Sequence, residues 1–252
     1  MKKWILLSCL VGSIFSHVIG QDIYIPDANF KAYLLNNKEI NTNGDKAIQQ
    51  SEAINFKGDI SCVNTNIKDF TGIEYFTQLH ALESWDNPIT SINLSKNKAL
   101  KSLAIQKAPI KNLNIEGLNQ LQELVISDTY IADLNIEGKH HLQKLYLSNS
   151  LIENLDFTAL TNLKELNVSH MNIATIDLSK TPYLHKLVLV NNFSLNRLNL
   201  ANKNHELLEE VYIIDNNQLN CIEVNNVDYI QNKIHPEDFF IEEHISLSTS
   251  CK

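Results

Sequence analysis

Side chains that carry oxygen atoms alternate along one short stretch of the chain, residues 41–52, whose sequence is NTNGDKAIQQSE. The stretch ends in a glutamate, which can hold a cation through both carboxylate oxygens. Hard oxygen ligands in this order are the set that Ca²⁺ prefers, since it takes roughly six to eight of them. The candidate metal ligands are Asn41, Asn43, Asp45, the backbone carbonyl of Ala47, Gln49 and Glu52.

The stretch follows the EF-hand loop pattern but departs from it at two positions. Asn41 stands where the pattern has aspartate, which leaves two formal charges among the ligands. Lys46 stands where the pattern has glycine, and a left-handed backbone there costs another residue about 1 kcal/mol. We expect any calcium affinity to be weak, on the order of 0.1–1 mM. The alternative is a plain turn between two helices, in which Asn and Gly serve the turn.

Two short helices are expected on either side of this stretch. Asp27 can cap the first helix, which then carries Phe30, Tyr33 and Leu34 on one face. The segment SEAINF directly after the stretch is expected to begin the second. Residues 21–56 are therefore predicted to form a small α-helical N-terminal cap.

From about residue 57 the chain repeats itself with a period of 21 residues. Segments of the type L-x-x-L-x-L start at 79, 100, 121, 142, 163, 184 and, after three extra residues, 208. Each unit has a second apolar triplet, and both halves end in the apolar–any–apolar period of a short strand. One unit cannot bury both halves alone, so stacked units must share a continuous core. The pattern predicts a mainly β repeat solenoid with two short strands per turn over residues 57–224.

The repeat resembles the leucine-rich repeats of secreted bacterial proteins, in particular arrays of the internalin type. The segment TGIEYFTQL resembles the entry turn of those arrays, and residues 199–224 resemble their exit. The asparagine that the family places inside each turn matches Asn87, Asn192 and Asn216. Four repeats have another residue there, and we expect less regular turns in the middle: Ala108, Thr129, Ser150 and Met171.

The first strand of each unit exposes one residue between its last two apolar positions. Tyrosine and valine occur there where solvent is expected, either because such residues suit strands or because they form an apolar binding patch with tyrosine anchors. The resemblance implies partner binding on this face, and we predict a protein or glycan partner. The candidate partner-binding residues on and beside this strand are Trp85, Val125, Tyr146, His170, Val188 and Tyr212.

The two ends of the chain indicate export. Residues 1–20 combine two lysines with an apolar run and are predicted to be a signal peptide. Cys221 and Cys251 flank the last part of the chain, where a disulfide would fasten a C-terminal cap, residues 225–252, and contribute about 3–4 kcal/mol. Cys62 lies in an alternating pattern and is expected to be a buried small apolar residue. We predict an extracellular, periplasmic or cell-envelope location without a membrane span.

The net charge of −8, without a basic run, argues against nucleic acid as a partner. No spacing of nucleophile and base or of zinc ligands stands out, so we predict no enzyme. The predicted function is an exported, non-enzymatic recognition module that binds a protein or glycan on the first-strand face. The alternative is a calcium-stabilised structural spacer or assembly subunit of the cell envelope.

Overall fold

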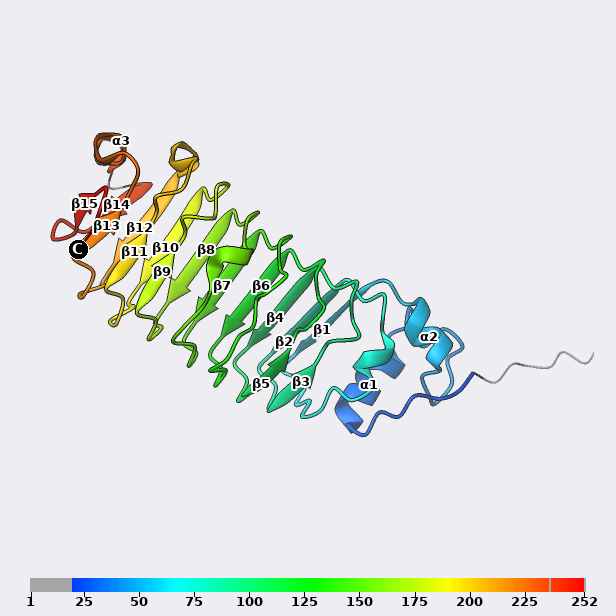
Figure 1. Cartoon of the computed structure of the whole chain (residues 1–252). Helices are drawn as coiled ribbons and strands as arrows, with labels where there is room; N and C mark the ends of the chain where they lie inside the picture. The colour runs from blue at the N-terminus through cyan, green and yellow to red at the C-terminus, as the bar shows by residue number, and fades with distance from the viewer. Residues whose placement is uncertain (1–19, 236, 252) are drawn as a thin grey trace, which may run out of the picture.

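The computed structural model of the chain describes residues 20–235 and 237–251, so the predicted signal peptide lies outside the described residues except for Gly20. The described chain is an elongated solenoid with two helices at its N-terminal end and smaller elements closing its C-terminal end (Figure 1). No helix among the described residues is both long enough and apolar enough to span a bilayer.

The N-terminal helices are α1 (Ala28–Asn36) and α2 (Gln50–Asn55). A carboxylate oxygen of Asp27 accepts hydrogen bonds from two first-turn N–H groups of α1, both at 2.9 Å, which confirms the predicted cap. Phe30 and Leu34 are fully buried against the first turns of the solenoid. Apolar spacing on one helix face therefore fastens the helix to the array.

One strand of every turn joins a parallel sheet of nine strands, which runs the length of the molecule (Figure 1). The 21-residue period keeps equivalent residues in register, so that Leu82 pairs with Leu103 and Leu103 with Leu124. The sheet continues beyond residue 224 into the predicted C-terminal cap. Its strands are β1 (Asp59–Val63), β2 (Ala81–Trp85), β4 (Ser102–Gln106), β6 (Glu123–Ser127), β7 (Lys144–Ser148), β8 (Glu165–Ser169), β10 (Lys186–Val190), β12 (Glu210–Ile214) and β14 (Phe239–Ile241).

The second strand of the unit forms two smaller parallel sheets on the other side of the core. Single-turn helices and one short helix complete the turns: η1 (Ile73–Tyr75), η2 (Phe157–Ala159), η3 (His205–Leu207) and α3 (Val227–Lys233). The strands of this side are β3 (Ser91–Asn93) with β5 (Asn112–Asn114), and β9 (Thr175–Asp177) with β11 (Arg197–Asn199), β13 (Cys221–Glu223) and β15 (Ser246–Ser248). The two turns between β5 and β9 lack the expected second strand.

Buried asparagines explain where the turns are regular. The Asn87 side-chain amide donates to the Cys62 carbonyl oxygen at 2.7 Å, and its oxygen accepts from the Ile67 N–H at 3.0 Å. Asn192 and Asn216 make equivalent bonds to the turns before them. Each amide thus ties one turn to the previous one.

Both turns without a second strand lack this amide, because they have Thr129 and Ser150 at the asparagine position. The expectation of less regular turns in the middle is confirmed. The turns with Ala108 and Met171 keep their second strands, β5 and β9, so a missing asparagine weakens the turn without always abolishing the strand.

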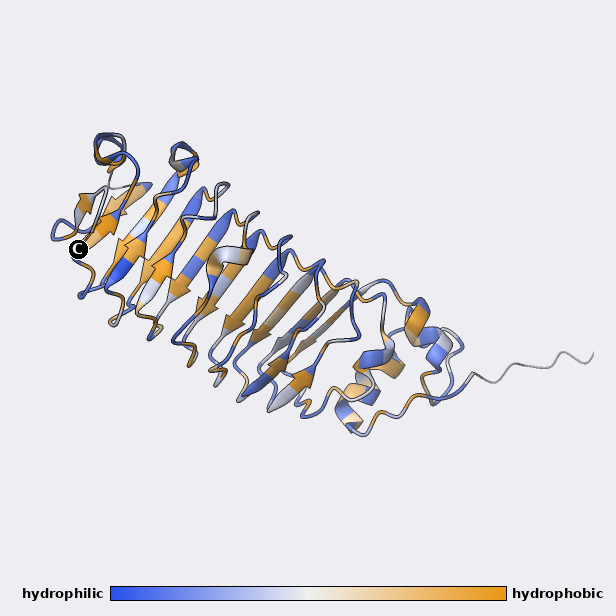
Figure 2. Ribbon diagram, viewed as in Figure 1, coloured by the Kyte–Doolittle hydropathy of each residue, from blue (hydrophilic) through white to orange (hydrophobic). Residues whose placement is uncertain are grey.

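Apolar side chains of both sides meet in one continuous core, and the hydropathy colouring alternates along the strands as this requires (Figure 2). The predicted disulfide between Cys221 and Cys251 is present, with Cα atoms 5.9 Å apart, and it holds the chain end against β13. Cys62 is a free, buried cysteine, as expected, and burial raises the pKa of its thiol to about 12. Its thiol is therefore protonated and inert at neutral pH.

Candidate functional site

A central row of side chains runs along the outer face of the nine-stranded sheet. Side chains alternate between core and solvent along each strand, so the central residue of every strand points outward. The row consists of Ser61, Glu83, Ala104, Val125, Tyr146, Asn167, Val188, Tyr212 and Phe240. Four of the predicted partner-binding residues therefore share one row.

Asn167 divides the apolar part of this row in two. Val125 is the register partner of Tyr146, and Val188 is the register partner of Tyr212. Phe240 extends the second group, because it pairs with Tyr212. Our sequence analysis missed Phe240. The apolar alternation of Phe239–Ile241 could have indicated a further strand, but residues 225–252 were assigned to a cap.

Both tyrosines are held in place through their hydroxyl groups. The Tyr146 hydroxyl donates to the carboxylate of Glu165, which also forms an ion pair with Lys144 at 3.1 Å. Burial and the adjacent Glu165 carboxylate raise the pKa of Tyr146. The Tyr212 hydroxyl donates to the carbonyl oxygen of Glu237 at 2.6 Å. Each ring is thus held in one orientation, and the Tyr146 phenol stays neutral at neutral pH.

A second row carries alternating charge. It consists of outward-facing residues at the start of the strands, two positions before the central row. Along five consecutive strands the register partners are Glu123, Lys144, Glu165, Lys186 and Glu210. Lys186 and Glu210 form a second ion pair at 2.5 Å. Burial opposes ionisation of Glu165, but hydrogen bonds from Tyr146 and Lys144 outweigh it and lower the pKa of this carboxyl group. The row gives the face a fixed charge pattern beside its apolar groups.

Trp85 and His170 lie at the margin of this face and not in its central row. Trp85 ends β2, is 40% exposed, and has the Lys107 ammonium 5.1 Å from its ring centroid. His170 follows β8 in a left-handed conformation, with its Nε2 atom 3.1 Å from the Asn191 side-chain nitrogen. Several strands separate the two residues, so the structure does not bring them together.

His170 belongs to a row of left-handed residues, each directly after a strand of the nine-stranded sheet. Asparagine and aspartate adopt this conformation more readily than most residues, and they fill six of the eight positions. That enrichment was the sequence signal for the row. Its members are Asn64, Asp86, Lys107, Asp128, Asn149, His170, Asn191 and Asp215.

The loop of residues 41–52 is closed by its own hydrogen bonds. Both carboxylate oxygens of Glu52 accept backbone N–H groups, from Thr42 at 2.8 Å and from Gln49 at 2.9 Å. One oxygen of Asp45 accepts the side-chain amides of Asn43 and Gln49, each at 3.0 Å. The other accepts the backbone N–H of Ala47 at 2.8 Å.

This conformation does not present a ligand shell for calcium. Lys46 is not left-handed, whereas the EF-hand turn needs that conformation at this position. Amide donors of Asn43 and Gln49 occupy the Asp45 oxygen that a cation would use. In favour of an ion, the side-chain oxygen of the buried Asn41 has no hydrogen-bond partner. Calcium binding at this loop would require both amides to rotate, whereas the alternative, a plain turn between two helices, requires no change.

Comparison with known proteins identifies the type of repeat and the fold. The family model described as the LRR domain of the endo-beta-N-acetylglucosaminidase EndoS matches residues 46–170. The described chain therefore has a leucine-rich repeat fold. It is similar to the functional domain of InlJ from Listeria monocytogenes, with a TM-score of 0.62 and 22% identity over 81% of this chain. It also resembles internalin C2 from L. monocytogenes, with a TM-score of 0.58 and 22% identity over 88% of this chain.

The internalin-like chain spans 52% of the InlJ domain and 94% of internalin C2. At this level of identity the two structures establish a shared fold. No curated protein sequence matches the chain significantly.

Proposed function

We propose that this internalin-like protein is an exported, non-enzymatic recognition module that binds a protein partner on the outer face of the nine-stranded sheet. The observation that carries the proposal is the ordered central row, in which Tyr146 and Tyr212 are fixed by their own hydroxyl bonds beside Val125 and Val188. Tyrosines that are already ordered lose little side-chain entropy on binding, and they are favoured interface anchors.

The dimensions of the face suit a protein. Nine strands at a spacing of about 4.8 Å and a width of five residues make a surface about 38 Å long and about 16 Å wide. That is roughly 600 Å², comparable with the ~800 Å² that each partner buries in a standard interface. The alternating charge row beside the tyrosines supplies specificity, because a partner must match its pattern.

The disulfide between Cys221 and Cys251 supports export, since such bonds persist in oxidising compartments. The signal peptide proposed for residues 1–20 agrees with this. The proposal leaves the extracellular space, the periplasm and the cell envelope as candidate locations. It assigns the chain no catalytic residue.

A double variant of the anchors tests the proposal. Immobilised wild-type protein and Tyr146→Ala plus Tyr212→Ala are exposed to secreted and envelope fractions of the source organism, and bound proteins are quantified by mass spectrometry. We expect a protein that the wild type retains to be reduced at least tenfold on the variant.

The matched control is Tyr24→Ala plus Tyr183→Ala, which removes two exposed tyrosines outside the sheet face. It should retain the same protein as the wild type. Equal retention by all three proteins would overturn the proposal. Self-association of the chain with no retained protein would instead support the structural-spacer alternative.

A further inference from the structure

A shallow groove crosses three consecutive turns that have no asparagine at the position of Asn87. Its floor is formed by Ala108, Thr129 and Ser150, and its volume is about 360 Å³. This lies within the range of small-ligand sites, roughly 300–1,000 Å³. The groove lies beside the sheet face but is formed by different residues from the tyrosine row.

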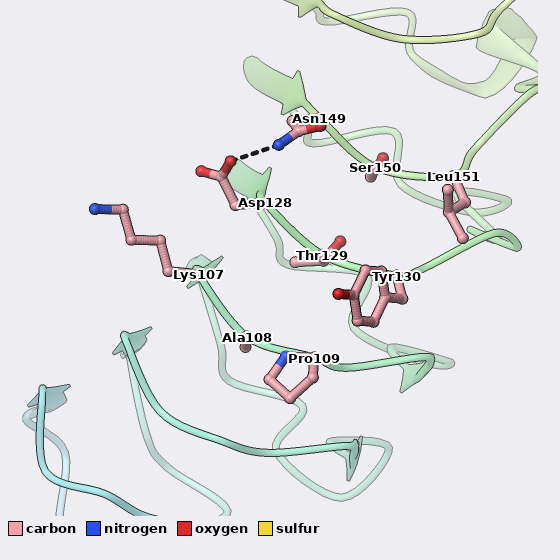
Figure 3. A pocket seen from close by; sticks show the side chains of 9 residues that line it. All are labelled: Lys107, Ala108, Pro109, Asp128, Thr129, Tyr130, Asn149, Ser150 and Leu151. Atoms are coloured by element: carbon pink, nitrogen blue, oxygen red, sulfur yellow. Dashed lines mark hydrogen bonds between the residues drawn. The ribbon is translucent and has the colours of Figure 1, made fainter.

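Two rows of side chains border the floor, one polar and one apolar. Figure 3 shows them on either side of Thr129, with the Tyr130 hydroxyl directed back between them. Tyr130 and Leu151 are each 55% exposed, although they are large apolar residues on neighbouring turns. The polar row is Lys107, Asp128 and Asn149, and the apolar row is Pro109, Tyr130 and Leu151.

The polar row offers hydrogen-bonding groups without a free positive charge. Asp128 accepts hydrogen bonds from the Asn149 amide at 2.7 Å and from the Ser127 hydroxyl at 2.8 Å. These bonds lower the pKa of Asp128, so its carboxylate is ionised at neutral pH. The Lys107 ammonium lies over Trp85 and points away from Tyr130 (Figure 3). An anionic ligand is therefore disfavoured.

An extended peptide does not fit this groove well. Pairing a peptide strand would need free backbone N–H groups. Four N–H groups of the floor and apolar row are used between turns: Ala108 donates to the Asp128 carbonyl and Thr129 to the Asn149 carbonyl, both at 3.2 Å, while Tyr130 donates to the Ile110 carbonyl at 3.0 Å and Leu151 to the Ile131 carbonyl at 2.9 Å. The floor also has small side chains and no deep pocket for an anchor residue.

We propose that the groove binds a short neutral oligosaccharide that lies along the solenoid axis. Neighbouring turns are about 4.8 Å apart, close to the length of one pyranose unit, so each turn would meet one sugar ring. The C–H face of a ring packs on Tyr130, while its hydroxyls bond to Asp128 and Asn149. A second hollow of about 470 Å³ on the other side of Leu151 takes a further unit.

The test titrates the purified protein with neutral di- to tetrasaccharides of three kinds: cello-, malto- and chito-oligosaccharides. Binding is followed by ligand-observed NMR and isothermal calorimetry. The wild type is expected to bind at least one series at millimolar concentration or below. Tyr130→Ala should weaken that binding at least tenfold by removing the stacking surface, and Asp128→Asn should weaken it by removing the carboxylate acceptor.

Tyr183→Ala is the matched control, because Tyr183 is 50% exposed but lies outside the groove. It should bind as the wild type does, and circular dichroism should show that every variant is folded. Three outcomes would overturn the proposal: no binding of any series by the wild type, equal loss in the control, or binding that survives both groove substitutions. The sheet-face experiment is independent of all three.

Discussion

Lys139 is the residue whose type conflicts most clearly with its place in the structure. Leu118 and Leu160 fill the same position one turn earlier and one turn later. Lys139 is only 2% exposed, and its ammonium group donates to the Glu137 carbonyl oxygen at 3.2 Å. Burial lowers the pKa of this lysine, although Glu116 and Glu137 partly oppose the effect. The charged form of Lys139 therefore lowers the free energy of unfolding, because it lies between the apolar Leu118 and Leu160.

Lys139→Leu is expected to stabilise the protein by about 1–3 kcal/mol, because it replaces a buried charge by an apolar side chain of similar size. Urea unfolding of both proteins measures the difference. Lys98→Leu is the control, since Lys98 is exposed and its replacement removes the same charge. Equal stability of the wild type and Lys139→Leu would contradict the prediction.

The same variant has a distinctive pH dependence. Because the pKa of Lys139 is lower in the folded protein than the ordinary 10.5, the unfolded chain binds more protons between the two values. The free energy of unfolding of the wild type should therefore rise as the pH rises through that interval. Lys139→Leu should lack this rise, whereas Lys98→Leu should keep it.

At the scale of the elements, much of the fold could be predicted because spacing alone specifies it. Leucines such as Leu82 and Leu103, 21 residues apart, can only stack as neighbouring strands. The missing second strands are harder to predict, because Ala108 and Thr129 make the same backbone bond to the next turn, at 3.2 Å, yet only the turn with Ala108 has a second strand. The sequence shows that the asparagine is absent but not which turn tolerates its loss.

The candidate sites depend on contacts that no single repeat contains. Tyr146 was predicted as a face residue, but its bond to Glu165 depends on the side-chain conformations of two neighbouring turns. The groove was missed for a similar reason, since Tyr130 and Leu151 form a wall only when their turns are stacked. The available sequence signal was the apolar residue that directly follows each non-asparagine position: Pro109, Tyr130 and Leu151.

The N-terminal loop provides a test at this scale. We expect the melting temperature of the wild type to be the same in millimolar calcium and in chelator, because amide donors already satisfy Asp45. Asp45→Ala should lower the melting temperature equally in both, since it removes three hydrogen bonds from the loop. Differential scanning calorimetry measures all four conditions.

A gain-of-function variant makes this result decisive. Asn41→Asp with Lys46→Gly restores both EF-hand positions and should create a calcium-dependent rise. If the wild type already shows such a rise and Asp45→Ala loses it, calcium binds at this loop, and the side-chain amides of Asn43 and Gln49 must rotate to admit it. The structural-spacer alternative would then gain its proposed stabilising ion.

At the scale of the whole molecule, the solenoid is a one-dimensional stack in which each turn is stabilised by its neighbours. The last turn has a neighbour on one side only and needs another constraint. β14 pairs with β12 and β15 pairs with β13, and the disulfide joins β13 to the end of the described chain. The bond closes a segment that includes α3 and both final strands.

Removing this bond should therefore unfold one end of the molecule and leave the middle intact. Cys221→Ser with Cys251→Ser is expected to reduce the stability of the C-terminal turn by about 3–4 kcal/mol, the chain-entropy value for a separation of 30 residues. Hydrogen exchange should show that the amides of β14 and β15 lose protection, while those of β4 to β8 keep theirs.

In the control Cys62→Ala, a small cavity in β1 should affect only β1 and β2. A uniform loss along the sheet in either variant would show that the array unfolds as one unit and would contradict nearest-neighbour stabilisation.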